Sequence, residues 1–250
     1  MPKSNRDLIV SYCTTYLKTA SCQDYCRNGL QVEGQAEISR IVSGVSFSLE
    51  LIRAAIRRKA EMLLVHHGIF RDDIPPPPAF EGVLKERLKL LLQHDINLCG
   101  FHLPLDAHPV IGNNISLCKL FSIRQPKPLD IGFIGELEEP KPLSKFIDLV
   151  ERKLDTQVKV IPAGPSKIKR VAVISGGASN YFSAAARAGA DTFLCGDIRE
   201  SVVRAVEEVG INLINAGHYN TERLGVQNLG KLISKKFRIP VEFVEVPCDV

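Results

Sequence analysis

The sequence lacks any long apolar run. No stretch approaches the roughly 18 consecutive apolar residues that a membrane-spanning helix needs. Residues 1–17 mix charged and apolar side chains, and they show none of the architecture of a signal peptide. Since 45% of the 250 residues are hydrophobic, we expect a globular protein with a sizeable core and no membrane partner.

A paired cysteine framework is also missing. The seven cysteines are odd in number and scattered, which favours reduced thiols in a cytoplasm over disulfides. Cys22 and Cys26 lie four positions apart, but no second cysteine or histidine pair completes a zinc knuckle. Both are therefore expected to be ordinary thiols.

Positive charge is not concentrated anywhere in the chain. The formal net charge is +4 and the isoelectric point is about 8.6, and the basic residues are dispersed. Nucleic-acid-binding domains usually have clustered basic residues and a higher isoelectric point. A nucleic-acid partner is therefore allowed but unsupported.

Several common catalytic loops are absent. The chain has no G-x-S-x-G elbow, no Walker A loop and no complete G-x-G-x-x-G motif. The stretch VISGGAS (173–179) has paired glycines after an expected strand, and it could either hold an anion or form a tight turn.

What the chain does have is an alternation of strand and helix patterns. Short apolar runs such as EMLLVHHG (61–68) and INLCGFH (96–102) are separated by amphipathic stretches such as LELIRAAIRRKA (49–60). This order predicts an α/β fold with a largely parallel sheet that is covered on both faces.

The second half repeats the order of the first. Aligning INLCGFHLPLD with INLINAGHYNTE places His102 on His218 and Asp106 on Glu222, each pair 116 positions apart. Similarity by chance between two βαβ units is the alternative to an internal duplication. We predict two domains, residues 1–124 and 125–250.

The same repeat aligns HHG with CGD, which places His67 on Asp197, 130 positions later in the sequence. The excess of 14 positions is explained by RDDIPPPPAFEG (71–82), which has no counterpart in the second half. Its four consecutive prolines predict an extended surface loop. The proline-rich segment 124–142 is the expected linker between the domains.

Five of the six histidines lie in three short stretches, each directly after an expected strand. These stretches are VHHG, GFHLPLDAH and AGHYNTE. Ligands gather beyond the carboxyl ends of strands in parallel α/β sheets, so imidazoles and carboxylates delivered there would make a metal site.

His66 and His67 are adjacent, and adjacent side chains on a strand point to opposite faces. They could bind one ion only if the chain turned at Gly68, or they could each serve a different ion of a pair. The plain alternative is two polar residues at the end of a strand.

In HLPLD, Asp106 could bind an ion through oxygen, or it could cap a helix starting in NNISLCKLF. His108, before a proline, fits a loop, and His94 fits a helix end, where it would favour the negative terminus.

In GHYNTE, Thr221 or Asn220 could cap a helix that starts after His218. Glu222 would then lie in the first turn, where it could offset the helix dipole or bridge two cations. Three histidines, one aspartate and one glutamate are together the ligands that a pair of divalent ions needs, with zinc, iron, manganese, cobalt or nickel as candidates.

These stretches together resemble one family, the GTP cyclohydrolase 1 type 2 homologues, also called NIF-three-like proteins. The likeness runs along most of the chain, and the sequence looks like the shorter, bacterial-type members. It is carried by NGLQVEG, LLVHHGIF, INLCGFHLPLDAHPVIGNN, ISGGASNYFSAAARAGADTFLCGD and AGHYNTERLGVQNL.

The resemblance implies two interlinked α/β domains of similar topology and a ring-shaped homohexamer with two divalent metal ions per chain. It assigns the metal ligands to a set of five residues, with the glutamate bridging: His66, His67, Asp106, His218 and Glu222. His102 would lie near the ions, as a ligand, as a group that orients one, or as a catalytic residue that moves protons. CGDIRES (195–201) departs from the pattern of many relatives, so we expect no ligand there.

The expected function is a metal-dependent hydrolase acting on GTP or a related nucleotide, in a cytoplasmic protein. Opening of a purine ring at C8 is the reaction that the family name implies. The alternatives are a metal-dependent phosphoesterase and a metal-binding ring without enzymatic activity that acts as a regulator, a chaperone or a nucleic-acid-associated scaffold.

Overall fold

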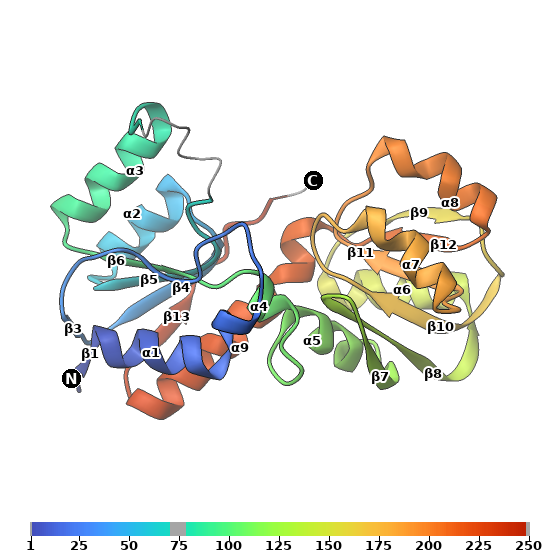
Figure 1. Cartoon of the computed structure of the whole chain (residues 1–250), viewed down its shortest axis with the longest axis horizontal. Helices are drawn as coiled ribbons and strands as arrows, with labels where there is room; N and C mark the ends of the chain where they lie inside the picture. Colours follow the sequence, from blue (N-terminus) through green and yellow to red (C-terminus); the bar gives the residue numbers. More distant parts are fainter. Residues whose placement is uncertain (1, 71–78, 249–250) are drawn as a thin grey trace. The chain divides into compact units, whose positions relative to one another are not determined.

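The chain folds into two compact units, each with its own sheet (Figure 1). The computed structural model describes residues 2–70 and 79–248, so most of the predicted proline-rich loop lies outside the described residues. The first unit is residues 1–105 with 225–246, and the second is 106–224 with 247–250. This division differs from the predicted one at residue 124, because residues 106–124 belong to the second unit and residues 225–246 return to the first. The two units are therefore interlinked.

The first unit has a five-stranded sheet in the order β13-β4-β5-β6-β2. Its strands are β2 (Gly29–Val32), β4 (Ile41–Ser46), β5 (Met62–His67), β6 (Asn97–Gly100) and β13 (Val241–Phe243), and a separate pair is β1 (Ser4–Asn5) with β3 (Glu37–Ile38). The strands β13, β4, β5 and β6 run parallel, and β2 is antiparallel to β6. Figure 1 shows β13, near the end of the chain, beside β4.

The helices of the first unit include three that lie wholly within it. They are α1 (Arg6–Tyr16), α2 (Leu49–Arg57) and α3 (Gly82–Gln93), with the short 3-10 helix η1 (Thr19–Ser21). Two further helices, α4 (Leu103–Asp106) and α9 (His218–Phe237), cross from one unit to the other. The helix α2 forms where the amphipathic pattern predicted it, because the Ser48 side chain caps it and Leu51 and Ile52 are fully buried.

The second unit has a six-stranded sheet in the order β7-β8-β10-β11-β12-β9. Its strands are β7 (Arg124–Leu129), β8 (Gly132–Pro142), β9 (Lys159–Pro162), β10 (Lys167–Val173), β11 (Thr192–Cys195) and β12 (Asn212–Asn215). Its helices are α5 (Asn113–Leu120), α6 (Leu143–Leu154), η3 (Ser179–Tyr181), α7 (Phe182–Arg187), η4 (Glu200–Val202) and α8 (Val203–Val209). The strands β10, β11 and β12 run parallel.

The expected linker at 124–142 is instead the antiparallel pair β7–β8. The prolines of this segment suggested a linker between the domains. Proline is tolerated in a strand at the edge of a sheet, however, and β7 is such a strand. Among the residues that the structure describes, no helix is both long and apolar enough to cross a membrane.

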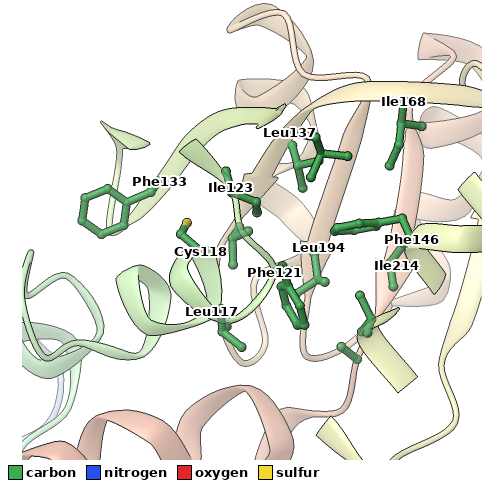
Figure 2. Packing of buried hydrophobic residues seen from close by; sticks show 14 of the residues in the cluster. Leu117, Cys118, Phe121, Ile123, Phe133, Leu137, Phe146, Ile168, Leu194 and Ile214 are labelled. Atoms are coloured by element: carbon green, nitrogen blue, oxygen red, sulfur yellow. The ribbon is translucent and has the colours of Figure 1, made fainter. Parts of the chain in front are cut away.

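The sheet of the second unit is buried on both faces. Val171 and Val173 of β10 belong to one hydrophobic cluster, and Ala172 and Ile174 belong to the other. Figure 2 shows the first cluster, in which the Phe121 and Phe146 rings meet edge to face at a centroid distance of 5.9 Å. Alternate residues thus pack in opposite directions, as expected for a largely parallel sheet.

The two units share one topology. The order β4-β5-β6-β2 in the first matches β10-β11-β12-β9 in the second, with the same strand directions. Met62 pairs with Asn97 in the first unit and Thr192 with Asn212 in the second. Thr192 follows Met62 by 130 positions, which equals the separation between His67 and Asp197.

Equivalent side chains make equivalent hydrogen bonds in the two units. Asn97 Oδ1 accepts from the backbone N of Gly34 at 2.8 Å, and Asn212 Oδ1 accepts from that of Gly164 at 2.9 Å.

A second matched set of bonds is made by the carboxylates that directly precede β5 and β11. Glu61 Oε2 accepts from two consecutive backbone N–H groups, at residues 39 and 40, and Asp191 Oδ2 does so at residues 169 and 170. These bonds support an internal duplication over chance similarity.

Candidate metal centre

The first unit gathers three histidines at the ends of β5 and β6. One ligand atom from each of His66, His67 and His102 lies within 4.8 Å of the others. His66 is fully buried and His102 is 4% exposed. Both are therefore held in a fixed place rather than displayed to solvent.

A separate oxygen holds Nδ1 of each of these rings. His66 Nδ1 lies 2.9 Å from the carbonyl oxygen of Phe101, and His67 Nδ1 lies 3.0 Å from Ser46 Oγ. His102 Nδ1 lies 2.9 Å from Asp24 Oδ1. A carbonyl or carboxylate can only accept, so it fixes the tautomer with Nδ1 protonated and leaves Nε2 as the nitrogen that can bind an ion.

The adjacent histidines lie close together without a turn at Gly68, which was one of the two arrangements considered for them. The rings of His66 and His67 have centroids 4.7 Å apart, although both residues belong to β5. Gly68 does not have a positive φ; instead, a Cβ on it would overlap the side-chain oxygen of Gln31. The glycine is therefore needed because another side chain lies close against the backbone.

Asp24 was not singled out by sequence reasoning, and it organises the loop behind His102. Its two carboxylate oxygens accept from His102 Nδ1, from Asn28 Nδ2 and from the backbone N of Cys26 and Leu103. Burial alone would raise the pKa of Asp24, but the hydrogen bonds from His102, Asn28 and Cys26 outweigh it and lower the pKa. The carboxylate is therefore held in its ionised form.

In the second unit, α9 begins at His218 itself, not after a cap at Asn220 or Thr221 as predicted. The Thr221 hydroxyl accepts from the backbone N of Gly176 at 3.0 Å and lies near the carbonyl oxygens of Gly217 and His218. Because the helix includes His218, Glu222 lies one turn further on the same face. His218 Nε2 and Glu222 Oε2 are 3.0 Å apart.

Asp197 holds the other nitrogen of that ring, with Oδ2 at 2.7 Å from His218 Nδ1. Burial lowers the pKa of His218, but hydrogen bonds to Asp197 and Glu222 raise it more strongly, to about 10. The repeat had aligned Asp197 with His67, so the sequence did contain a signal for this position. Asp197 orients the imidazole from the side opposite Glu222.

A glycine turn makes room for Glu222. Gly176 has a φ of 65°, and a Cβ on it would overlap Glu222 Oε1. A Cβ on Gly196 would come within 2.8 Å of the Gly176 backbone. Of the two interpretations of VISGGAS, the tight turn fits this segment, because Gly176 has a positive φ and lies close against Glu222.

Asp106 lies at the end of α4 and is 2% exposed. Its Oδ1 accepts from Asn113 Nδ2 at 2.8 Å and from Ser175 Oγ at 2.9 Å. The helix α5 starts at Asn113 as predicted, but its N-cap is Gly112, so Asp106 does not cap it.

The two remaining histidines behave as predicted. His94 is the C-cap of α3, and His108 lies in a turn where its Nδ1 accepts from the backbone N of Val110 and Ile111.

The chemistry of these donors fits divalent metal ions. Buried histidine, aspartate and glutamate side chains of this chain could hold such ions. Within the first unit the candidate donors are imidazoles, and within the second they are one imidazole and two carboxylates. Mixed nitrogen and oxygen ligands of this kind suit first-row transition metals.

Known proteins resemble this chain along almost its whole length. The family model described as Duf34/NIF3 (NGG1p interacting factor 3) matches residues 4–249. A Pseudomonas aeruginosa protein is 41% identical over 245 residues, covering 96% of each chain. A Pyrococcus horikoshii protein is 40% identical over 250 residues, covering 97% of this chain and 98% of that one. Both relatives are named GTP cyclohydrolase 1 type 2 homolog.

Solved structures agree with this assignment. The protein ybgI, described as of unknown function, is 35% identical with a TM-score of 0.93, covering 99% of this chain and 100% of that one. A Thermus thermophilus protein is 32% identical with a TM-score of 0.90 at the same coverage. The resemblance first drawn from the histidine motifs is thereby confirmed, and the chain belongs to the Duf34/NIF3 family.

Proposed function

We propose that this chain is a metal-dependent hydrolase that uses two divalent ions and acts on GTP or a related nucleotide. The residues that would hold the ions are His66, His67, Asp106, His218 and Glu222, and Glu222 has two carboxylate oxygens to offer. The observation that carries the proposal is the fixed orientation of four imidazoles. Each Nδ1 lies within 3.0 Å of an oxygen atom, which orients the ring and leaves Nε2 on the side away from that oxygen.

Each unit contributes a distinct part of the proposed donor set. The first supplies neutral imidazoles from the end of β5, and the second supplies carboxylates that balance the charge of two cations. Divalent ions bound to these residues would supply Lewis acidity and would lower the pKa of a bound water. The native metal stays open among zinc, iron, manganese, cobalt and nickel.

His102 is proposed to move protons at this site. Asp24 holds its Nδ1–H and orients the ring, so Nε2 is the nitrogen that would take a proton from water and return it to a leaving group. Its place beside His66 and His67 is equally compatible with a third imidazole ligand in the first unit. His102→Gln separates the two roles, because loss of a ligand lowers metal content and loss of a proton carrier does not.

The proposed substrate class comes from the relatives, which are named GTP cyclohydrolase 1 type 2 homolog. Hydrolytic opening of a purine ring at C8 gives a formamide, and hydrolysis of that formamide by a second water would release formate, whereas a phosphoesterase with the same paired ions would release phosphate. Assaying both products with GTP and other nucleotides therefore discriminates between the two reactions.

A homohexameric ring in the cytoplasm remains part of the proposal, and size-exclusion chromatography with light scattering tests the assembly. Metal-loaded protein without turnover, but with salt-dependent binding to single-stranded nucleic acid, would favour the scaffold alternative.

The decisive experiment measures metal content by elemental analysis on untagged protein purified without chelator. We expect about two ions per chain in the wild type, and fewer in Glu222→Gln and His67→Gln. His94→Gln is the matched control, because His94 is an exposed helix cap away from the cluster, and it should keep the wild-type content. Wild-type protein that holds no metal and cannot be reloaded would overturn the proposal.

A further inference from the structure

A cavity of about 380 Å³ lies in the first unit beside the histidine cluster. The described part of its lining comes from two loops, residues 24–27 and 69–70, together with Gln31. A bridge between Cys26 and Phe70 joins the loops. This volume falls within the range of small-molecule sites, roughly 300 to 1,000 Å³.

The wall of this cavity carries two aromatic rings. Tyr25 and Phe70 are stacked, with centroids 5.7 Å apart and ring planes at 24°. Tyr25 is 58% exposed, a large area of aromatic surface for a residue so close to a buried cluster. The Cys26–Phe70 bridge fixes both loops, so the rings need little ordering when they receive a ligand.

Among the lining residues that the structure describes, the charged side chains are Asp24 and Arg27. The Asp24 carboxylate is already satisfied by four donors, among them His102 Nδ1. The Gln31 amide is used as well, because its oxygen accepts from the backbone N of Ile69 and its nitrogen donates to the Arg27 carbonyl. Arg27, which is exposed, contributes the cationic side chain.

The rings also contact the histidine cluster. Tyr25 meets His102 edge to face at a centroid distance of 5.0 Å, and Phe70 does so at 5.4 Å. Phe70 lies 5.8 Å from the ring of His67. A ring stacked on this wall would therefore have its edge next to the imidazoles of the first unit.

We infer that this cavity binds a planar aromatic or heteroaromatic ring that carries an anionic group. The ring stacks on Tyr25 and Phe70, the anion pairs with Arg27, and the cavity positions the substrate of the proposed hydrolase. The inference thus rests on the proposed function for its purpose, although the binding itself needs only residues of the first unit.

The test compares phenyl phosphate, cyclohexyl phosphate and inorganic phosphate as probes of the metal-stripped full chain by ligand-observed NMR. Stacking should make phenyl phosphate bind roughly twofold to tenfold more tightly than cyclohexyl phosphate. Tyr25→Ala should remove that preference, and Tyr25→Phe should keep it. Arg27→Gln should weaken both esters roughly tenfold, while Arg204→Gln, at a side chain that is 84% exposed in the second unit, should not.

Equal binding of the two esters, binding of inorganic phosphate as tight as that of phenyl phosphate, or no binding at all would overturn the inference. Metal content is measured on the same samples before stripping. Intact metal content without ring binding would reject only the cavity assignment. Ring binding that responds to Tyr25→Ala in a protein that never holds metal would reject only the hydrolase.

Discussion

Asp197 Oδ2 lies 2.7 Å from His218 Nδ1, just as Asp24 Oδ1 lies 2.9 Å from His102 Nδ1. In each unit a carboxylate from a loop orients an imidazole through the nitrogen that does not face the candidate ligand position. Such partners typically change metal affinity by about 10- to 100-fold.

Replacing Asp197 with asparagine should therefore weaken metal binding by about 10- to 100-fold, because the imidazole loses a charged partner but keeps a hydrogen-bond acceptor. Competition with a chelator of known affinity measures the change. Asp148→Asn, at a side chain that is 60% exposed, is the control and should leave the affinity unaltered. An Asp197→Asn variant with wild-type affinity would show that Asp197 does not act on the ligand.

Metal binding should release a proton from His218. The pKa of His218 is about 10 in the metal-free protein, so the ring is protonated at pH 7 and an ion must displace that proton. If the His218 proton is the one that competes with the ion, the apparent metal affinity should fall about tenfold for each pH unit below about 10. Calorimetry in two buffers with different ionisation enthalpies measures the released proton, and identical heats in both would contradict the prediction.

The same group makes the stability of the metal-free protein depend on pH. Its folded pKa of about 10 is above its model value of 6.5, so its contribution to the free energy of unfolding is complete below about pH 6.5. That contribution should be lost as the pH rises toward 10. Urea unfolding at pH 7 and pH 9.5 checks this, and His218→Gln should show a weaker decline over the same range.

A side chain at Gly176 should disturb Glu222 specifically. Gly176→Ala adds a Cβ that overlaps Glu222 Oε1 and also strains a backbone with φ of 65°. Gly82→Ala is a matched control, because Gly82 has a φ of 54° but no atom within 4 Å of the added Cβ. Both variants should lose about 1 kcal/mol of stability from backbone strain. Only Gly176→Ala should also lose metal content, and equal metal content in both variants would rule out the steric effect.

The buried cysteines should react with a thiol reagent much more slowly than the exposed and partly exposed ones. Burial raises the pKa of Cys13, Cys118 and Cys195 to about 12, so these thiols stay protonated and unreactive at pH 8. Cys248 is exposed and Cys22 is partly exposed. A thiol reagent should therefore modify two cysteines quickly in the native protein and all seven after denaturation. Fast modification of four or more would show that the cores open readily.

The sequence was sufficient to predict the α/β class, the repeat and the clustering of histidines after strands. These features depend on local patterns, because apolar runs specify buried strands and strand ends specify where polar side chains meet. The start of α9 was misjudged for a tertiary reason. Thr221 looked like a cap, but its hydroxyl is the acceptor for the backbone N of Gly176, 45 positions earlier.

Asp24 and the strand β7 could not be predicted for similar reasons. Asp24 lies in a loop between two cysteines, and its importance comes from four donors, two of which are residues 102 and 103. The prolines of β7 are typical of a linker in any local reading. Only the pairing of β7 with β8 shows that it is the edge of a sheet, where the missing N–H groups are tolerated.

Because the two units share one topology, they can be compared position by position. Both units keep the asparagine whose oxygen accepts from the backbone N of Gly34 or Gly164. Both also keep a carboxylate that accepts from the backbone N of residue 39 or residue 169. They differ at the end of the matching strand, where one copy has His67 and the other Asp197. The same scaffold therefore accepts an imidazole in one unit and a carboxylate in the other at this matched position, so the donor chemistry can vary while the strand order stays the same.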